Sequence, residues 1–289
     1  MGKIIEKIYN VHYLIKFEDL FLGASTVFIA ACFAYGGLPE TGLEKLSLAI
    51  LFCILGLASI NALNQIADVE IDKINKPHRP LPSKKLKRKT VFLISFILSL
   101  FAGLITIYLG IGYFIIALAG LAIGLLYNVP PIYAKKNAVF GMLLIGFGYG
   151  VLMFLVGWGV HQPFFSIPLW ILGFLYLHEV IFSSSKDFSD IKGDSYADVK
   201  TIPVIFGKKK GSLICYLLYL IPYVILLILK LNGNITSNVY PLLGLGPIAG
   251  IIVFGFCGLY EKKYSYIGYF LSIIVSLVVK ISLFFIYIQ

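Results

Sequence analysis

Uncharged apolar runs account for most of this chain, and their lengths predict its elements. A helix needs about 20 mainly apolar residues to cross the hydrocarbon layer of a bilayer. Five runs of about that length predict single membrane-spanning helices. They cover Leu20–Gly36, Leu46–Ala67, Ser212–Leu229, Val239–Tyr260 and Tyr266–Ile288, the last of which contains one charged residue, Lys280.

Two longer uncharged runs each hold enough residues for a pair of spans. The run that follows Lys89 has 45 residues, and the run that follows Lys136 has 42. We expect the first to turn back at the Gly-Ile-Gly sequence of residues 110–112 and the second at the His-Gln-Pro sequence of residues 161–163. Together with the five single spans, these pairs predict an all-α, polytopic membrane protein with about nine transmembrane helices.

The basic residues test this count, because Lys and Arg collect in the cytoplasmic loops of membrane proteins. Of the 24 Lys and Arg residues, 21 fall in the N-terminal segment or in the loops after spans two, four, six and eight. The others are Lys45 and Lys230, on the opposite side, and Lys280, within the last span. The alternation predicts a multi-pass protein of the cell membrane, with the N-terminus and even-numbered loops cytoplasmic and the C-terminus outside.

Composition agrees with a membrane protein and excludes other classes. Only 13% of the 289 residues are charged and 59% are hydrophobic, whereas soluble domains average about 25% charged residues. Disordered chains have low hydrophobicity, so this composition also excludes a disordered protein. The net charge of +10 would suit a nucleic-acid-binding protein, but the basic residues follow the loop alternation, and we expect no nucleic acid partner.

Acidic residues are rare and concentrated. Of 14 carboxylates, seven lie in two of the predicted cytoplasmic loops. Their spacing places each set on one helical face, at i, i+4, i+8 in the first and at i, i+3, i+7, i+11 in the second. The first set, with an amide at its start, is Asn64, Asp68 and Asp72. The second set is Asp187, Asp190, Asp194 and Asp198.

Like charges on one helical face repel each other, so cations should accompany both sets. Nearby lysines alone could pair with solvated carboxylates, but two such sets at the ends of two spans favour a metal site. Mg²⁺ takes oxygen ligands and is usually held by one or two carboxylates with water and substrate phosphates. Basic side chains accompany the sets: Lys73, Lys76, Arg79, Lys186 and Lys192. Both signs together predict a site for Mg²⁺ and a diphosphate.

These motifs resemble those of the UbiA superfamily of intramembrane prenyltransferases. Residues 64–79 are similar to its first motif, NxxxDxxxD followed by NKPxRP, and residues 186–194 contain its second, DxxDxxxD. Residues 127–135 are similar to its YxxPPxxxK loop. Order, spacing and length agree, which implies a single membrane-embedded prenyltransferase domain over residues 1–289. One departure is Gln65, where many members have Asp.

The resemblance implies a helix bundle around a central cavity, with the two acidic motifs facing each other under a cytoplasmic cap. The catalytic carboxylates would be Asp68, Asp72, Asp190 and Asp194. The Mg²⁺ ligands would be Asn64, Asp68, Asp72, Asp187, Asp190 and Asp194. The diphosphate contacts would be Arg79, Lys135, Lys186, Lys16 and Tyr127. The ring of Tyr127 would also face the allylic carbocation.

The implied reaction is the Mg²⁺-dependent transfer of an isoprenyl group from a polyprenyl diphosphate, such as geranylgeranyl diphosphate, to a small acceptor. The implied partners are that diphosphate, the acceptor and the lipid bilayer. Family acceptors include aromatic quinone precursors and geranylgeranylglyceryl phosphate. The first motif favours an aromatic acceptor, with lipid-phosphate transfer of the digeranylgeranylglyceryl phosphate synthase type as the alternative.

A secondary transporter is the alternative from another class, because ionisable residues within spans often line ion or proton paths. His178, Glu179 and Lys280 would form such a path. Transporters bind their ions near the membrane midplane, on discontinuous helices. Here the aspartates gather at one cytoplasmic edge, which favours the enzyme.

Overall fold

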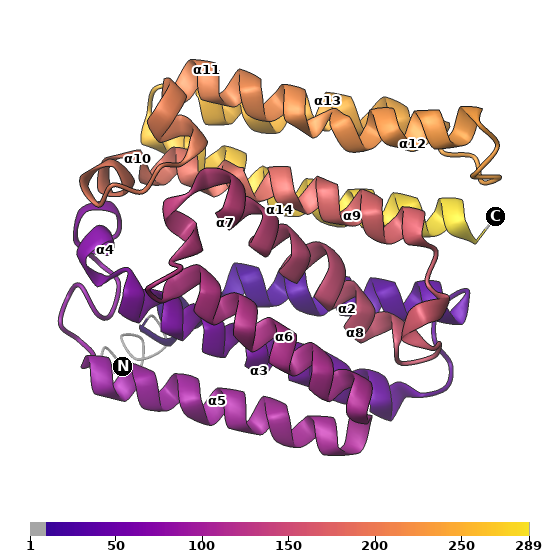
Figure 1. Cartoon of the computed structure of the whole chain (residues 1–289), viewed down its shortest axis with the longest axis horizontal. Helices are drawn as coiled ribbons and strands as arrows, with labels where there is room; N and C mark the ends of the chain where they lie inside the picture. The colour runs from indigo at the N-terminus through magenta and orange to yellow at the C-terminus, as the bar shows by residue number, and fades with distance from the viewer. Residues whose placement is uncertain (1–9, 289) are drawn as a thin grey trace, which may run out of the picture.

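The computed structural model describes residues 10–288 as an all-α bundle whose long helices run between two ends (Figure 1). Within this described part, nine segments pass from one end to the other. They are α2 (Phe17–Tyr35), α3 (Leu43–Ala67), α5 (Arg88–Leu109), α6 (Ile111–Asn128), α7 to α8 (Ala138–Trp158), α9 (Leu169–Phe182), α11 to α12 (Ile202–Leu231), α13 (Tyr240–Gly258) and α14 (Lys262–Tyr287). The all-α, multi-pass architecture predicted from the sequence is confirmed.

Eight of these segments are long and apolar enough to cross a membrane, by the residues described. The ninth, α9, has only 14 residues and continues into a short 3₁₀ helix, η4 (Ser183–Lys186). The predicted turn between spans three and four lies at Gly110, whose φ of 103° is readily adopted only by glycine. The nine predicted spans thus correspond to eight full-length helices and one short one.

Apolar side chains also cover the outside of the bundle. Ile107 is 79% exposed and Leu169 is 81% exposed, and similar residues line the outer faces of α5, α6 and α13. An extended apolar outer surface of this kind marks contact with a membrane. The fold is therefore an inside-packed bundle with a lipid-facing exterior.

Two predicted spans differ from single regular helices. The fifth consists of α7 (Ala138–Gly146), a π-helical turn η2 (Phe147–Leu152) and α8 (Met153–Trp158). The seventh begins at Ile202 rather than Ser212, and it is kinked at Gly207, whose φ of 74° and ψ of 168° are not helical. The lysines of residues 208–210, which hydropathy excludes from the span, follow the kink and are helical. This span comprises α11 (Ile202–Tyr219) and α12 (Ile221–Leu231).

Two short helices, α4 (Val69–Asn75) and α10 (Asp187–Tyr196), lie beyond the spans at the same end of the bundle (Figure 1). The spacing of the first acidic set assumed a helix that continues from span two through Asp72. The structure shows instead that this helix is interrupted. α3 ends at Ala67, and Asp68 breaks the helix with φ −96° and ψ 8°. α10 follows α9 through η4. The acidic segments therefore belong to a cap over the end of the bundle.

Asn75 joins the two cap helices. Its Nδ2 donates to the carbonyl oxygen of Asp190 at 2.7 Å, and its Oδ1 accepts from the backbone N–H of Gly193 at 2.8 Å. A Cβ atom at Gly193 would lie 2.5 Å from the Asn75 amide nitrogen. The absence of a side chain at this position lets α10 approach α4 closely, and this contact sets the two acidic segments opposite each other.

Candidate functional site

Two adjoining cavities occupy the bundle beneath α4 and α10. The first, the polar cavity, has a volume of about 420 Å³ and is lined by charged side chains. The second, the apolar cavity, has a volume of about 380 Å³ and extends along the bundle between mainly apolar walls. Seven residues line both cavities and form their junction: Lys16, Asn64, Tyr127, Ile145, Ser183, Lys186 and Tyr269. A ligand with a charged head and an apolar tail fits this shape.

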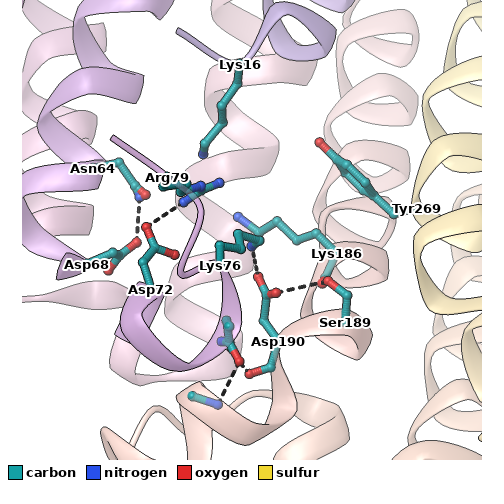
Figure 2. Close-up of polar contacts among 12 residues, drawn as sticks. Lys16, Asn64, Asp68, Asp72, Lys76, Arg79, Lys186, Ser189, Asp190 and Tyr269 are labelled. Atoms are coloured by element: carbon teal, nitrogen blue, oxygen red, sulfur yellow. Dashed lines mark hydrogen bonds and ion pairs between the residues drawn. The ribbon is translucent and has the colours of Figure 1, made fainter. Parts of the chain in front are cut away.

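The first acidic set enters the polar cavity from the break between α3 and α4. The Asp68 carboxylate accepts a hydrogen bond from Asn64 Nδ2 at 2.8 Å and forms an ion pair with Lys135. Asp72 accepts from the Arg79 guanidinium at 2.7 Å (Figure 2). Burial raises the pKa of Asp72 although Arg79 acts to lower it. Each aspartate of this set therefore faces a cationic side chain.

The second acidic set enters the same cavity from α10. Asp190 forms an ion pair with Lys76, which follows α4, and accepts a hydrogen bond from Ser189 Oγ at 3.0 Å (Figure 2). Burial acts to raise the pKa of Asp190, but the charges of Lys76 and Arg79 outweigh it, so this pKa lies below its ordinary value. This ion pair connects the segment after α4 to the second acidic set.

Asp187 and Asp194 have no such partner. Among residues 10–288, neither carboxylate forms an ion pair or a side-chain hydrogen bond. Burial raises the pKa of Asp187 to about 7, with Asp190 adding to the effect, and raises the pKa of Asp194 to about 8, with Asp187 and Asp190 adding to it. Crowded carboxylates of this kind match the oxygen ligands that Mg²⁺ prefers.

The carboxylates surround the cavity without meeting at one point. In the part of the chain that is described, no three His, Cys, Asp or Glu side chains lie close enough together to hold a metal ion. Asp68, Asp72 and Asp190 each face a Lys or Arg instead. The donor set fits a divalent cation, and these ion pairs would have to open for all the carboxylates to bind one.

Cations also converge on the polar cavity. The Lys16 ammonium points toward the Arg79 guanidinium, and Lys186 and Lys76 lie on the facing side (Figure 2). Burial lowers the pKa of Lys16 to about 8, and these cations add to the effect, while Asp19 acts to raise it. Neighbouring buried cations are stabilised by an anion between them, and phosphate oxygens suit both lysine and arginine.

Two amides of α3 position Lys16. Asn61 Nδ2 donates to the carbonyl oxygen of Ile15 at 2.9 Å, and Gln65 Nε2 donates to that of Leu14 at 2.9 Å. Both side chains are buried. They tie the backbone before α2 to α3 and leave Lys16 at the junction, with φ 52°. Gln65, which departs from the family motif, thus acts as a tether at this position.

Lys135 and Tyr127 reach the cavity from either side of the loop after α6. Lys135 is buried, and its Nζ lies 4.7 Å from the Tyr133 ring centroid as well as beside Asp68. Tyr127 accepts a hydrogen bond from Lys186 Nζ at 3.3 Å, and that ammonium lies 5.4 Å from its ring centroid. The Tyr127 ring already faces one cation at the junction of the two cavities.

The polar cavity contains every site residue expected from the sequence, namely Lys16, Asn64, Asp68, Asp72, Arg79, Tyr127, Lys135, Lys186, Asp187, Asp190 and Asp194. Asp198, which the spacing adds to the second set, does not line it. Sequence reasoning missed the Lys76 pair with Asp190, the Asn75 clamp and Tyr269. The NKP sequence in the first motif was the available signal for Asn75 and Lys76, whereas nothing in the sequence distinguishes Tyr269 from the other tyrosines.

Two residues of the transport alternative, Glu179 and Lys280, pair with each other. Lys280 Nζ lies 2.7 Å from Glu179 Oε1 and 2.7 Å from Ser276 Oγ, all buried between α9 and α14. His178 Nε2 lies 3.3 Å from the Tyr219 hydroxyl. These contacts describe a fixed polar link between helices rather than an open path.

The fold and site together define a class of protein: a polytopic helical membrane protein with two facing acidic motifs above an apolar cavity. The model of the UbiA prenyltransferase family matches residues 24–283. The chain therefore belongs to the UbiA prenyltransferase family.

Individual relatives extend the comparison. The chain is 33% identical to digeranylgeranylglyceryl phosphate synthase of Methanococcus aeolicus over 205 residues, covering 68% of this chain and 69% of that one. It is 33% identical over 177 residues to the chloroplastic 2-acyl-4-prenylphloroglucinol 6-prenyltransferase of Humulus lupulus, covering 57% and 43%. A UbiA homologue from Archaeoglobus fulgidus, solved with DMAPP and Mg²⁺ bound, shares the fold with a TM-score of 0.70 at 18% identity, covering 93% and 98%.

Proposed function

We propose that this chain transfers an isoprenyl group from an isoprenyl diphosphate to the hydroxyl group of a glyceryl-ether lipid phosphate and releases diphosphate. The observation that carries the proposal is the junction between the two cavities. A polar cavity with carboxylates and cations opens onto an apolar cavity through shared residues. A diphosphate head fits the first and a prenyl chain the second, so the allylic carbon would lie at the junction.

The proposed Mg²⁺ ligands are Asn64, Asp68, Asp72, Asp187, Asp190 and Asp194. When bound, Mg²⁺ supplies Lewis-acid stabilisation of the negative charge that develops on the leaving diphosphate. Lys16, Arg79 and Lys186 bind the phosphate oxygens and stabilise the same charge. The walls of the apolar cavity exclude water from the allylic cation. The Tyr127 ring, which already neighbours an ammonium, stabilises that cation through its π face.

The lipid-phosphate acceptor is better supported than the aromatic acceptor expected from the sequence. The alignment with the Methanococcus aeolicus synthase covers more of both chains than the alignment with the phloroglucinol prenyltransferase does. A phosphate on the acceptor also suits the excess of cations around Lys16. Both acceptor classes are tested in the same assay.

The test uses the purified protein with geranylgeranyl diphosphate, Mg²⁺ and either geranylgeranylglyceryl phosphate or 4-hydroxybenzoate. Mass spectrometry measures the prenylated product. We expect product from the lipid phosphate and none after chelation with EDTA. If product formed with 4-hydroxybenzoate and not with the lipid phosphate, the acceptor would be aromatic and the proposed lipid acceptor would be wrong.

Carboxylate-to-amide variants test the metal site in the same assay. We expect Asp68→Asn and Asp190→Asn to lower turnover by about 100-fold or more, because each removes an electrostatic contribution to the transition state. The matched control is Glu70→Gln, since Glu70 is exposed and pairs with Lys73 outside the cavity. Full activity in both aspartate variants would refute the assignment.

A further inference from the structure

Asp19, on α2, is an acidic side chain outside both motifs that faces the reaction space. Among the described residues, two carboxylates line the apolar cavity, Asp19 and Glu179. Glu179 is neutralised by Lys280 at 2.7 Å. Asp19 pairs with Lys16, whose Nζ lies 3.9 Å from Oδ2, and 14% of the Asp19 side chain is exposed. Asp19 is therefore the carboxylate of this cavity that keeps a free face.

The position of Asp19 is fixed by two residues of the junction. Tyr269, on α14, donates its hydroxyl hydrogen to Asp19 Oδ1 at 3.2 Å. Lys16, from the turn before α2, lies on the other oxygen. Figure 2 shows Tyr269 and Lys16 facing the space above Lys186. Because both residues line both cavities, the Asp19 carboxylate lies beside the place where the allylic carbon would meet its acceptor.

The motif aspartates are poorly suited to accept a proton there. Asp68, Asp72 and Asp190 already face Lys135, Arg79 and Lys76 in the polar cavity. All five motif aspartates, including Asp187 and Asp194, which are unpaired among residues 10–288, are proposed ligands of Mg²⁺ in the reaction. Glu179 is already paired with Lys280. Asp19 has no such engagement among the described residues beyond Tyr269 and the longer contact with Lys16.

We infer that Asp19 is the general base of the transfer and accepts the proton of the attacking hydroxyl; this inference rests on the proposed function. The bond from the allylic carbon to the diphosphate oxygen breaks, and its electron pair leaves with the diphosphate. A bond forms from the acceptor oxygen to the same carbon. The acceptor O–H proton moves to an Asp19 oxygen and later passes to water, so atoms and charge balance.

The first test is Asp19→Asn, which keeps an oxygen that can accept the Tyr269 hydrogen bond but cannot take the proton. General base catalysis contributes about 10²–10⁴-fold in rate, and we expect kcat for transfer to fall by that factor. Affinity for Mg²⁺–geranylgeranyl diphosphate should stay within about threefold, because Asp19 is not itself a proposed ligand of Mg²⁺ or diphosphate and its contact with Lys16 is long, at 3.9 Å. The matched control is Glu44→Gln at the opposite end of the bundle, with no change expected. Asp19→Glu should recover part of the activity.

The second test separates a base from a structural role. A lipid phosphate acceptor with fluorine beside the attacking hydroxyl has a more acidic O–H and depends less on a base. We expect the ratio of wild-type to Asp19→Asn rates to shrink at least about tenfold with this acceptor. An equal ratio for both acceptors, or wild-type turnover in Asp19→Asn, would overturn the assignment. Absence of transfer to either lipid acceptor by the wild-type protein would instead overturn the proposed function.

Discussion

Glu179 and Lys280 form a buried ion pair within the membrane-spanning part of the bundle, with 7% and 1% of their side chains exposed. Removing one partner of such a pair leaves the other charge buried and costs about 3–5 kcal/mol. We expect Glu179→Gln and Lys280→Met each to lower the free energy of unfolding by this amount. Denaturant titration in mixed micelles measures the loss.

The double variant Glu179→Gln/Lys280→Met is the control for this pair. Replacing both charges leaves no unpaired ion, so we expect most of the lost stability to return. Additive losses in the double variant would show that the two side chains do not stabilise each other.

At the residue scale, the sequence identifies the chemistry of the site better than its contacts. The motif spacing predicts Asp68 and Asp190 as site residues, because rare carboxylates stand out in an apolar chain. It does not predict that Lys76 crosses from one motif to pair with Asp190. Nor does it reveal that Gln65 ties the segment before α2 to α3, since long-range pairing depends on how the helices pack.

Gly193 carries the main prediction at the element scale. A Cβ atom there would overlap the Asn75 side chain at 2.5–2.8 Å. Gly193→Ala should push α10 away from α4 at a cost of about 1–3 kcal/mol in the free energy of unfolding. Displacing the Asp190 and Asp194 carboxylates should lower transfer about 10–100-fold, which the product assay measures. Gly173→Ala is the control, because nothing lies within 4 Å of that position, and a matching loss there would contradict the explanation.

The sequence predicts helix existence well and helix breaks poorly. Hydropathy locates α2, α3 and α5 because each contains a long charge-free apolar run after its first turn. The break at Asp68 and the π-helical turn over Phe147–Leu152 leave no such signal. The first depends on how the cap packs over the bundle. The π-helical turn lies where Gly146 and Gly150 pack against α9. An added Cβ atom would lie 2.3 Å from Val180 at Gly146 and 2.6 Å from Leu175 at Gly150.

At the scale of the whole molecule, the charge alternation predicts the orientation in the membrane. The lysine-rich loop after α4 lies at the end that carries the polar cavity, and the turn between α12 and α13 lies at the opposite end (Figure 1). Because basic loops stay in the cytoplasm, we expect both acidic motifs to face the cytoplasm. The diphosphate would then enter the polar cavity directly from that side.

Cysteine labelling in intact cells tests this orientation. The four native cysteines are free and buried, so a membrane-impermeant maleimide should give little background. Lys87 and Asn234 are exposed positions at the two ends. We expect Asn234→Cys to be labelled in intact cells and Lys87→Cys only after permeabilisation. The reverse pattern would place the acidic motifs outside the cell, where the basic loops would have had to cross the membrane against their charge preference.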